Sequence, residues 1–286
     1  MENILNKWGL FDLSVELIES PSKSTWDVNG KYILKRISDV EHLKKSLQLS
    51  ILLSTEGIPV AAYIPTPDGQ ITVINEGSQY CLMTKLPGKH IDIYEQPYFA
   101  VEMGRELARL HKALVRIESI LLCNDNDLLA DWRNYIKPGL DEDVPDELSE
   151  HAEKWLLRLY TKLPRQLIHR DVHLYNVLFN NECLTGWLDF DLGCRNIRLF
   201  DIAYLFGGII LGKQYDTEKV KTWRLICNEL LASYCEINPL TNDEHKALPT
   251  LMIIIELLFV AFWNNLGNPE QRKQALDLAK WLYCEL

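Results

Sequence analysis

The sequence predicts an α+β protein with two lobes, a small β-rich N-terminal lobe and a large, mostly helical C-terminal lobe. A chain of 286 residues is long enough to build two modest lobes, each with its own core. Short strand-like runs separated by turn signals dominate up to residue 84, and helical periodicity dominates most of the remainder. The predicted division is therefore an N-terminal lobe at 1–84, a hinge at 85–88 and a C-terminal lobe at 89–286.

The composition excludes several classes of protein. Hydrophobic residues make up 47% and charged residues 24% of the chain, which is typical of a globular protein and of neither a disordered nor a collagen-like one. The formal net charge is −10 and no block of Lys or Arg occurs, which argues against binding to nucleic acid or to an anionic membrane. An acidic surface suits a cationic substrate, although the need for solubility alone would also explain it.

The cysteines and the N-terminus indicate a cytoplasmic protein. The seven cysteines form no C-x-x-C pair, and an odd number cannot close a full disulfide framework within one chain. The N-terminus carries an early Glu2 and no long apolar run, so no signal peptide is predicted. The longest apolar stretch, 251–263, is interrupted by Glu256 and is too short to cross a bilayer.

The predicted elements of the N-terminal lobe follow from hydrophobic periodicity and turn residues. After a short amphipathic helix and a polar connection at 19–25, the Asn29-Gly30 turn predicts a hairpin of strands 26–28 and 31–37. Apolar residues at helical spacing predict a helix from 41 to 55 that Gly57 stops. Strand-like runs follow at 70–74 and 80–84.

The C-terminal lobe is predicted to be mostly helical. Helices are expected at 97–114 and 151–163, with an acidic, proline-containing connection at 140–150 between them. Residues 166–190 form a strand–loop–strand block. The chain from 201 to 286 is predicted to be helical, including 248–263 and 270–286.

The strand–loop–strand block carries the most informative motif. His169-Arg170-Asp171 follows a short apolar run, Asn176 precedes a second one, and Asp189 follows a third. A hairpin of this length would return its end beside the first loop, so Asp171, Asn176 and Asp189 are expected to converge. Two carboxylates and an amide oxygen form an oxygen-only set that suits magnesium and not zinc.

These residues resemble the catalytic and metal-binding motifs of the aminoglycoside phosphotransferase and choline kinase-like family, which has a protein-kinase-like fold. Leu110-His111 resembles a Leu-His pair near the end of one of the family's helices. Residues 82–88 resemble its lobe-connecting hinge, and 201–203 its Asp segment beyond the metal motif. The resemblance covers residues 20–210, and its Asp-Asn-Asp core is the specific part.

The resemblance implies a Mg²⁺-dependent transfer of the γ-phosphate of ATP to a hydroxyl of a small molecule. The acceptor would be an antibiotic such as an aminoglycoside, or a metabolite such as choline or homoserine, and GTP is not excluded as donor. The implied roles are proton acceptance or hydroxyl orientation by Asp171, Mg²⁺ binding by Asn176 and Asp189, phosphate contacts by Lys35, Ser22 and Ser24, and adenine contacts by the backbone of Thr84 and Leu86.

Other residues have a structural interpretation, a functional one, or both. His169 is interpreted as structural, and Asp201 as a brace for the catalytic loop. His173 either lies near the acceptor or is an ordinary loop residue, and Asp191 either assists the metal or caps the next segment. Glu256 either faces the acceptor cleft or occupies an exposed position on a mostly buried helix.

Two departures from the family pattern keep other hypotheses open. The segment 20–25 contains no glycine, and the acidic partner of Lys35 is not evident among Glu41, Gln48 and Glu56. These departures are compatible with a catalytically silent binding or spore-coat-type relative, although the intact Asp171, Asn176 and Asp189 argue against it. A metal-dependent hydrolase that uses the same Mg²⁺ site is a third possibility.

The expected partner is a small-molecule acceptor, with no nucleic acid and no membrane, and the expected state is a monomer or weak homodimer. Only a short segment separates Asp189 from Asp201, and no Ala-Pro-Glu follows, so the activation segment that a peptide acceptor would need is absent. The acidic run 141–150 would suit a cationic acceptor, but a solvated loop is the favoured interpretation.

Overall fold

The computed structural model describes the chain except for residues 1, 19–23, 38, 122–123, 214 and 286. Its residues group into two compact units. The first consists of Met1–Lys89 together with Val177–Asp191, and the second of His90–Asn176 together with Leu192–Leu286. The predicted lobes follow chain order, whereas in the structure the segment Val177–Asp191 belongs to the N-terminal unit.

The first unit is built on an antiparallel sheet with the strand order β1-β2-β3-β6-β4, and β5 also pairs with β6. The predicted hairpin is confirmed: Val28 pairs with Tyr32, and both Asn29 and Gly30 have the positive φ that this turn needs. The strands are β1 (Val15–Leu17), β2 (Thr25–Val28), β3 (Tyr32–Ile37), β4 (Tyr63–Ile64), β5 (Thr72–Asn75) and β6 (Ser78–Thr84).

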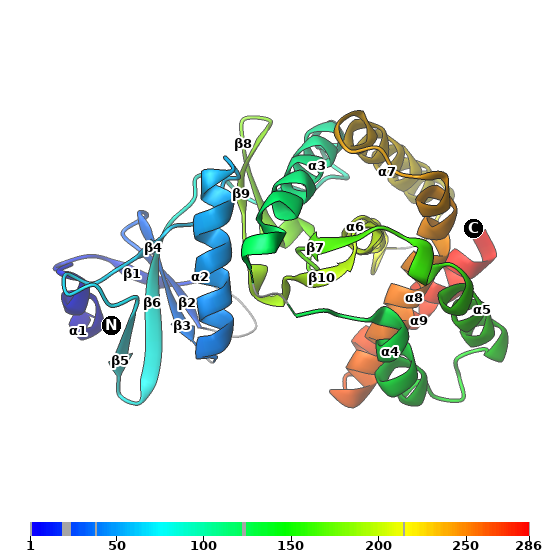
Figure 1. Cartoon of the computed structure of the whole chain (residues 1–286), viewed down its shortest axis with the longest axis horizontal. Helices are drawn as coiled ribbons and strands as arrows, with labels where there is room; N and C mark the ends of the chain where they lie inside the picture. The colour runs from blue at the N-terminus through cyan, green and yellow to red at the C-terminus, as the bar shows by residue number, and fades with distance from the viewer. Residues whose placement is uncertain (1, 19–23, 38, 122–123, 214, 286) are drawn as a thin grey trace. The chain divides into compact units, whose positions relative to one another are not determined.

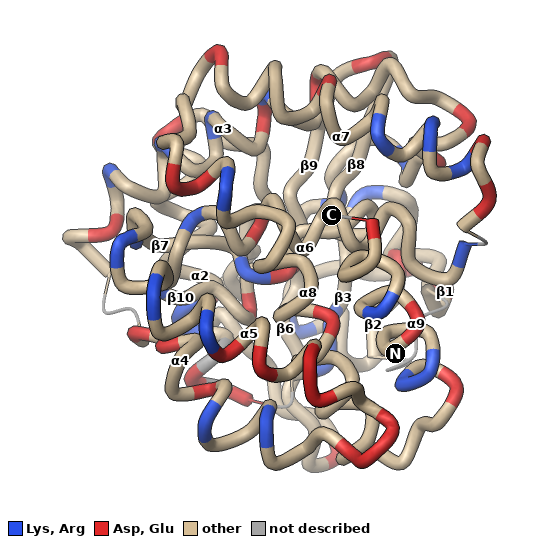
Figure 2. The backbone as a smooth tube through the Cα atoms, turned by 90° about the vertical axis from the view of Figure 1, so that its right-hand side faces the viewer, with Lys and Arg blue, Asp and Glu red and all other residues tan. Residues whose placement is uncertain are grey.

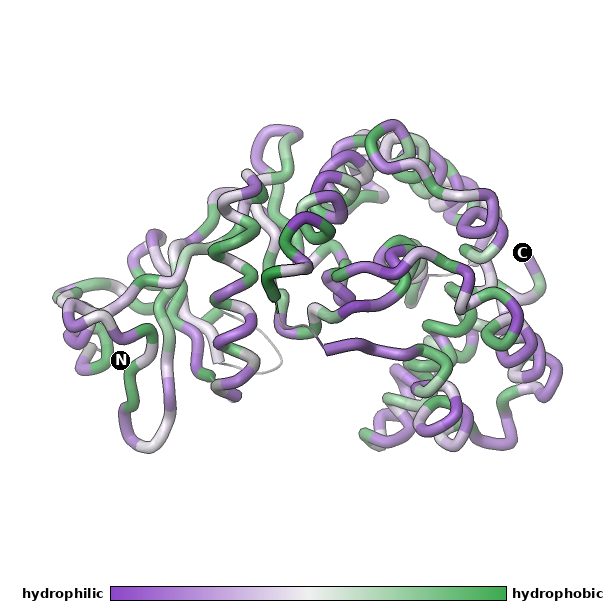
Figure 3. The backbone as a smooth tube through the Cα atoms, viewed as in Figure 1, coloured by the Kyte–Doolittle hydropathy of each residue, from purple (hydrophilic) through white to green (hydrophobic). Residues whose placement is uncertain are grey.

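Helical segments before and after the first strands complete this part of the first unit. The helix α1 (Glu2–Leu5) and the 3₁₀ turn Asn6–Trp8 contribute Ile4, Leu5 and Trp8 to a core shared with the sheet. The indole N–H of Trp8 donates to Ile64 O at 2.8 Å. The predicted helix at 41–55 is α2 (Val40–Thr55), in which hydrophilic and hydrophobic residues alternate, as in an amphipathic helix (Figure 3).

The hairpin of β8 (Val177–Asn180) and β9 (Cys183–Trp187) forms backbone hydrogen bonds with two other segments of the first unit. Lys89 and Phe179 exchange two backbone hydrogen bonds of 2.9 Å, and Trp187 N donates to Pro59 O at 2.8 Å. Gly88 has a φ of +117°, and a Cβ there would lie 2.8 Å from Phe179 O. Only glycine therefore allows the chain to pass this close to the hairpin.

The second unit is mainly helical (Figure 1). Its two-stranded antiparallel sheet pairs β7 (Arg165–Ile168) with β10 (Cys194–Ile197). The α-helices are α3 (Phe99–Ile117), α4 (Leu128–Asp131), α5 (Asp146–Arg158), α6 (Leu199–Ile210), α7 (Thr217–Ile237), α8 (Asn242–Asn265) and α9 (Pro269–Glu285). Shorter helical turns lie at Glu118–Ile120, Trp132–Ile136, Lys137–Gly139, Tyr160–Lys162, Leu174–Asn176 and Phe190–Leu192, the last spanning the boundary between the two units.

The acidic run 141–150 is only partly a loop. The helix α5 begins at Asp146, because Pro145 fixes the entry of the chain and two acidic residues in the first turn complement the helix dipole. Both Asp141 and Asp143 pair with Arg272 on α9. Charges of both signs are interspersed along the helical region (Figure 2). The two loop carboxylates are thus engaged by an arginine of their own unit.

The helix α8 is longer than the predicted 248–263 and is the main core helix of the second unit. It begins with a capping box formed by Thr241 and Glu244. By length and composition alone it could cross a membrane, with a mean hydropathy of 1.9 over its most apolar window, of which 67% is buried inside the protein. A buried core helix of a soluble protein passes the same test, so the finding is weak evidence for a membrane span.

A buried ion pair joins the beginnings of α6 and α8. Arg198 donates through Nε and one Nη to the two carboxylate oxygens of Glu244, at 2.7 and 2.8 Å. Its guanidinium also donates to Asn238 Oδ1 at 2.7 Å and to Pro239 O at 2.8 Å. Because both charged side chains have hydrogen-bond partners, the pair fixes the start of α6, the helix that carries Asp201.

Candidate active site

The loop after β7 is held by one buried carboxylate. Asp201 on α6 accepts the backbone N–H groups of His169 at 2.9 Å and Arg170 at 2.7 Å. It also lies 3.0 Å from Nε2 of His111 on α3. Arg170 has a φ of 68°, a strained conformation for a residue other than glycine. Asp201 therefore braces this loop, as predicted, and His111 of the Leu110-His111 pair braces Asp201.

Asp171 is the carboxylate that this loop presents. Tyr204 OH donates to Asp171 Oδ1 at 2.9 Å, and Nδ2 of Asn176 donates to Oδ2 at 2.9 Å. His173 Nε2 lies 3.5 Å from Oδ2. Burial by itself would raise the pKa of Asp171, but the interactions with His173 and Tyr204 outweigh it and hold the pKa below its ordinary value. The carboxylate is therefore ionised at neutral pH.

The orientation of His173 follows from its second nitrogen. The backbone N–H of Tyr175 donates to Nδ1 of His173 at 3.2 Å. In the neutral imidazole the proton is then on Nε2, the nitrogen that faces Asp171. His173 thus supports the ionised form of Asp171.

Asn176 ends the 3₁₀ turn Leu174–Asn176 and is buried. Its Nδ2 donates both to the backbone oxygen and to the carboxylate of Asp171, each at 2.9 Å. Because the amide nitrogen is used in this way, the side-chain oxygen of Asn176 faces away from Asp171. Among the described residues this oxygen accepts no hydrogen bond, so it is free to serve as a ligand.

The first unit brings a lysine together with two carboxylates. Lys35 on β3 lies 3.5 Å from Asp189 Oδ1 and 3.2 Å from Asp191 Oδ2. Partial burial would lower the pKa of Lys35, but the two carboxylates raise it above its ordinary value. Burial and the neighbouring Asp191 raise the pKa of Asp189, although Lys35 opposes them. Asp189 has a φ of 55°, the second strained residue of the predicted motif.

The acidic partner of Lys35 comes from the metal motif and not from α2. Among the predicted candidates, Glu41 pairs with Lys44 at 2.6 Å, and Gln48 is exposed. Instead, α2 contributes Ser46, whose hydroxyl donates to Asp191 Oδ1 at 2.5 Å. Asp191 therefore contacts both Lys35 and α2, so the absence of a glutamate at the expected place leaves the lysine with charged partners.

The other predicted nucleotide contacts are only partly described. Ser22 lies outside the described residues, and Ser24 precedes β2, with its backbone oxygen accepting Arg36 N at 2.8 Å. The N–H of Thr84 already donates to Ala62 O at 2.9 Å. The N–H of Leu86 has no hydrogen-bond partner in the described part of the chain, so of these backbone donors it is the available one.

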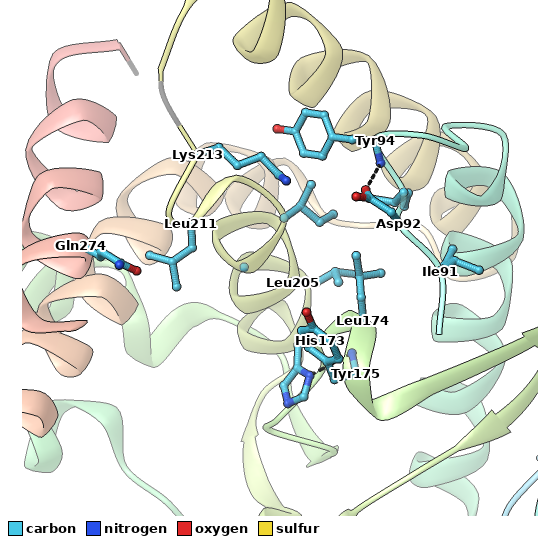
Figure 4. Close-up of a pocket in the computed structure, with 13 residues that line it drawn as sticks. Ile91, Asp92, Tyr94, His173, Leu174, Tyr175, Leu205, Leu211, Lys213 and Gln274 are labelled. Atoms are coloured by element: carbon cyan, nitrogen blue, oxygen red, sulfur yellow. Dashed lines mark hydrogen bonds between the residues drawn. The ribbon is translucent and has the colours of Figure 1, made fainter. Parts of the chain in front are cut away.

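A cavity of about 340 Å³ lies in the second unit beside the loop that follows Asp171 (Figure 4). His173, which contacts Asp171, forms part of its wall. Lys213 and Tyr94 lie on the opposite side from His173 in Figure 4. The remaining lining residues are mostly apolar and come from the segment before α3, from the turn Leu174–Asn176, from α6 and the residue after it, and from α9: Ile91, Asp92, Ile93, Leu174, Tyr175, Leu205, Gly208, Ile209, Leu211 and Gln274.

Of the two positions considered from the sequence for Glu256, the exposed one is wrong, because the side chain is only 3% exposed. Glu256 is not among the residues that line the cavity. Its Oε1 fits into the notch left by Gly207 on α6, where a Cβ would lie 2.7 Å away. Its Oε2 is buried with no hydrogen-bond partner among the described residues, and burial raises the pKa of Glu256 to about 8.

Sequence reasoning missed Tyr204 and Ser46. Tyr204 follows Asp201 by three positions, so helical spacing could have placed both on the side of α6 that faces the loop. Its ring also stacks on Phe259 of α8, with centroids 5.6 Å apart. Ser46 carried no signal, because a serine within an amphipathic helix has no distinctive pattern.

A strand lysine paired with the carboxylates of an Asp-Phe-Asp motif, together with a braced His-Arg-Asp loop and its asparagine, defines a phosphotransferase with a protein-kinase-like fold. The sequence profile of the phosphotransferase enzyme family matches residues 17–229. The chain belongs to this family, and it is a kinase of small molecules.

The comparisons with individual proteins agree with this assignment. A homoserine kinase of Polaromonas naphthalenivorans is 30% identical over 78% of this chain and 71% of its own length. A homoserine kinase of Methylobacillus flagellatus is 27% identical over 81% of this chain and 72% of its own. Neither relative supports the catalytically silent alternative.

Solved structures share the fold at low sequence identity. A GDP complex of aminoglycoside 2′-phosphotransferase-IIIa matches 98% of this chain and 96% of its own, with a TM-score of 0.73 and 15% identity. The amicoumacin kinase hAmiN, in complex with AMP-PNP, Ca²⁺ and amicoumacin, matches 92% of this chain and 88% of its own, with a TM-score of 0.69 and 16% identity. The predicted two-lobe, kinase-like fold class is thus confirmed.

Proposed function

We propose that this protein transfers the γ-phosphate of ATP to the hydroxyl of homoserine in a Mg²⁺-dependent reaction, with Asp171 as the residue that receives the hydroxyl proton. The observation that carries the proposal is the ionised Asp171, held by Tyr204 and Asn176 beside a small cavity whose wall includes His173. Two relatives that match more than two thirds of the chain are homoserine kinases, which supports this choice of acceptor.

The proposed reaction needs little covalent help from the protein. The acceptor oxygen forms a bond to the γ-phosphorus as the bond from that phosphorus to the bridging oxygen of ATP breaks, and ADP leaves. The proton of the hydroxyl passes to Asp171, whose low pKa keeps it ionised and ready to orient the hydroxyl. His173 and Tyr204 hold the carboxylate in place, so its main contribution is alignment.

The available oxygens fit a hard divalent cation. Asn176 offers its free amide oxygen and Asp189 its carboxylate, and Mg²⁺ is commonly held by one or two such ligands together with substrate phosphates. Among the described residues no three His, Cys, Asp or Glu side chains gather as a metal-binding group. When bound, the ion would neutralise charge on the phosphates. Lys35 would leave its contacts with the carboxylates for the α- and β-phosphates.

The remaining parts of the proposal concern the nucleotide and the setting. Leu86 would bind adenine through its free N–H and Thr84 through its carbonyl, and Ser22 and Ser24 would lie near the phosphates. ATP is the proposed donor, although a structural neighbour was solved with GDP. A cytoplasmic monomer or weak homodimer, with no nucleic acid or membrane as partner, completes the proposal.

Nucleotide binding is tested by thermal unfolding of the wild type and of Asp189→Ala, with and without Mg²⁺·ATP. Ligand at ~100 times Kd stabilises a folded protein by roughly 2.7 kcal/mol, a shift of several degrees in Tm. We expect this shift in the wild type and a smaller one in Asp189→Ala, because the variant lacks one ligand of the cation. Equal shifts in both proteins would remove Asp189 from the metal site.

The acceptor is tested by following ADP release with homoserine, choline, kanamycin, a macrolide and simple sugars. We expect release to depend on homoserine and the product to carry one phosphate on its hydroxyl, because the two relatives that support the choice of acceptor are homoserine kinases. Release with kanamycin alone would replace the proposed acceptor while leaving the reaction class unchanged. Release without any acceptor, at a turnover ordinary for an enzyme, would favour the hydrolase alternative.

A further inference from the structure

The cavity in the second unit carries charged groups that are not explained by the catalytic chemistry. Among its lining residues, Lys213 is a basic and Asp92 an acidic side chain, and the other polar members include His173 and Gln274. The rest of the wall is largely aliphatic. In a mostly apolar pocket, one basic and one acidic side chain determine which charged groups a ligand can carry and how it is oriented.

Lys213 is a basic side chain for which the described residues supply no ion-pair partner. Its Nζ lies 4.5 Å from the centroid of the Tyr94 ring, a cation–π contact that holds the ammonium at the cavity, as Figure 4 shows. In the described part of the chain no carboxylate lies within ion-pair distance of this ammonium. The three donors of the ammonium are therefore available to an anionic group of a ligand.

Asp92 is fixed in place and still has capacity to accept. Its Oδ1 accepts the backbone N–H of Tyr94 at 2.9 Å, the contact drawn as a dashed line in Figure 4. This turn holds the carboxylate beside the backbone of Tyr94, the residue whose ring contacts Lys213. No lysine or arginine among the described residues pairs with it, so Oδ2 is available to a cationic group.

We infer that this cavity binds an acceptor that carries both a carboxylate and an ammonium group, with Lys213 binding the carboxylate and Asp92 the ammonium. The inference rests on the proposed function. It places the charged end of the acceptor on the side of the cavity opposite His173, and the hydroxyl near His173, where Asp171 would accept its proton. A polycationic acceptor would meet one carboxylate and be repelled by Lys213. Ile93, Leu205 and Ile209 suit the short methylene chain between the charged groups and the hydroxyl.

The test compares three ligands that differ only in which charge they carry. L-homoserine has both groups, 4-hydroxybutyrate lacks the ammonium, and 3-aminopropan-1-ol lacks the carboxylate. The Kd of each is measured by calorimetry on the full chain without nucleotide, and the KM of each is measured by ADP release. The variants are Lys213→Gln, Lys213→Arg and Asp92→Asn, the last of which keeps the oxygen that accepts Tyr94 N–H. Lys246→Gln on α8, an exposed lysine, is the matched control.

Lys213→Gln is expected to raise Kd and KM about 10- to 100-fold for homoserine and 4-hydroxybutyrate, the range for a lost hydrogen bond to a charged group. It should leave 3-aminopropan-1-ol unchanged, and Lys213→Arg should restore most of the affinity. Asp92→Asn should weaken homoserine and 3-aminopropan-1-ol and spare 4-hydroxybutyrate. Lys246→Gln should change none of the three.

The outcomes separate this inference from the proposed function. If homoserine is phosphorylated and Lys213→Gln behaves like Lys246→Gln, the inference is overturned and the proposed function stands. If homoserine is not phosphorylated but binds, and that binding is lost in Lys213→Gln, the charge pattern of the site is supported and the identity of the acceptor is wrong. If the wild type neither binds nor phosphorylates any of the three ligands, both fail.

Discussion

Asp171→Asn is expected to lower kcat by about 10²- to 10⁴-fold, the range for loss of a positioned general base. Asparagine keeps the size of the side chain and can still meet Tyr204 and Asn176, but it cannot receive the hydroxyl proton. The KM for ATP should change little, because the proposed role of Asp171 is toward the acceptor hydroxyl and not toward the nucleotide. Initial rates of ADP release with homoserine measure both constants.

The control for this prediction is Asp146→Asn, which removes the same charge from an exposed position on α5. It should leave kcat unchanged. The stabilisation by Mg²⁺·ATP in thermal unfolding should survive in Asp171→Asn, which would show that the variant is folded and binds nucleotide. A variant with wild-type kcat would show that Asp171 is not the proton acceptor.

Glu256→Gln is expected to change how stability depends on pH. Burial raises the pKa of Glu256 from 4.5 to about 8, so between these values the folded protein holds a proton that the unfolded chain has released. The free energy of unfolding therefore falls as pH rises through this interval, and the loss levels off above pH 8. The contribution is on the order of 3–5 kcal/mol for a group buried this completely. Glutamine cannot ionise, so the variant should lack this loss.

The measurement is urea unfolding of both proteins at pH 5 and pH 9. The free energy of unfolding of Glu256→Gln minus that of the wild type should be larger at pH 9 than at pH 5. Glu229→Gln, on an exposed part of α7, is the matched control and should follow the wild type at both values. The same pH dependence in Glu256→Gln and in the wild type would show that Glu256 is ionised in the folded protein.

The parts of the fold that could be predicted depend on local sequence. Asn29-Gly30 specifies its hairpin because the turn needs two residues that accept positive φ. The periodicity of 41–55 predicted α2 to within one residue, because one apolar stripe suffices to define a helix that covers a core. The spacing of His169, Asp171, Asn176 and Asp189 identified the family for the same reason, since the whole motif lies in one short block.

The missed elements depend on contacts that are distant in sequence. The strand β10 is four residues long and includes Arg195 and Asn196, so it shows no apolar alternation. It is a strand because it pairs with β7 and because Asn196 accepts a hydrogen bond from the buried Tyr160 OH at 3.2 Å. β1 and β4 are similarly too short to carry a pattern of their own.

The same distinction applies to the candidate site. Lys35 was recognisable only through the resemblance to the family, because its alternating strand alone is equally typical of a solvated lysine. Its carboxylate partners lie far along the chain. The pairing of Ser46 with Asp191 joins residues 145 positions apart, and no local rule predicts it. The roles predicted for Ser22, Ser24, Thr84 and Leu86 stay predictions, as does the convergence of Asp171, Asn176 and Asp189.

The attachment of the β8–β9 hairpin to the first unit has a consequence for how the protein folds during synthesis. Residues up to Lys89 leave the ribosome long before the hairpin that completes their unit has been made. Until then Lys89 lacks the backbone partners that Phe179 supplies, and Pro59 lacks Trp187. Closing this long loop makes the first unit intrinsically slow to complete. A fragment that ends at residue 89 should accordingly be a poor independent folding unit, even though it contains most of the sheet.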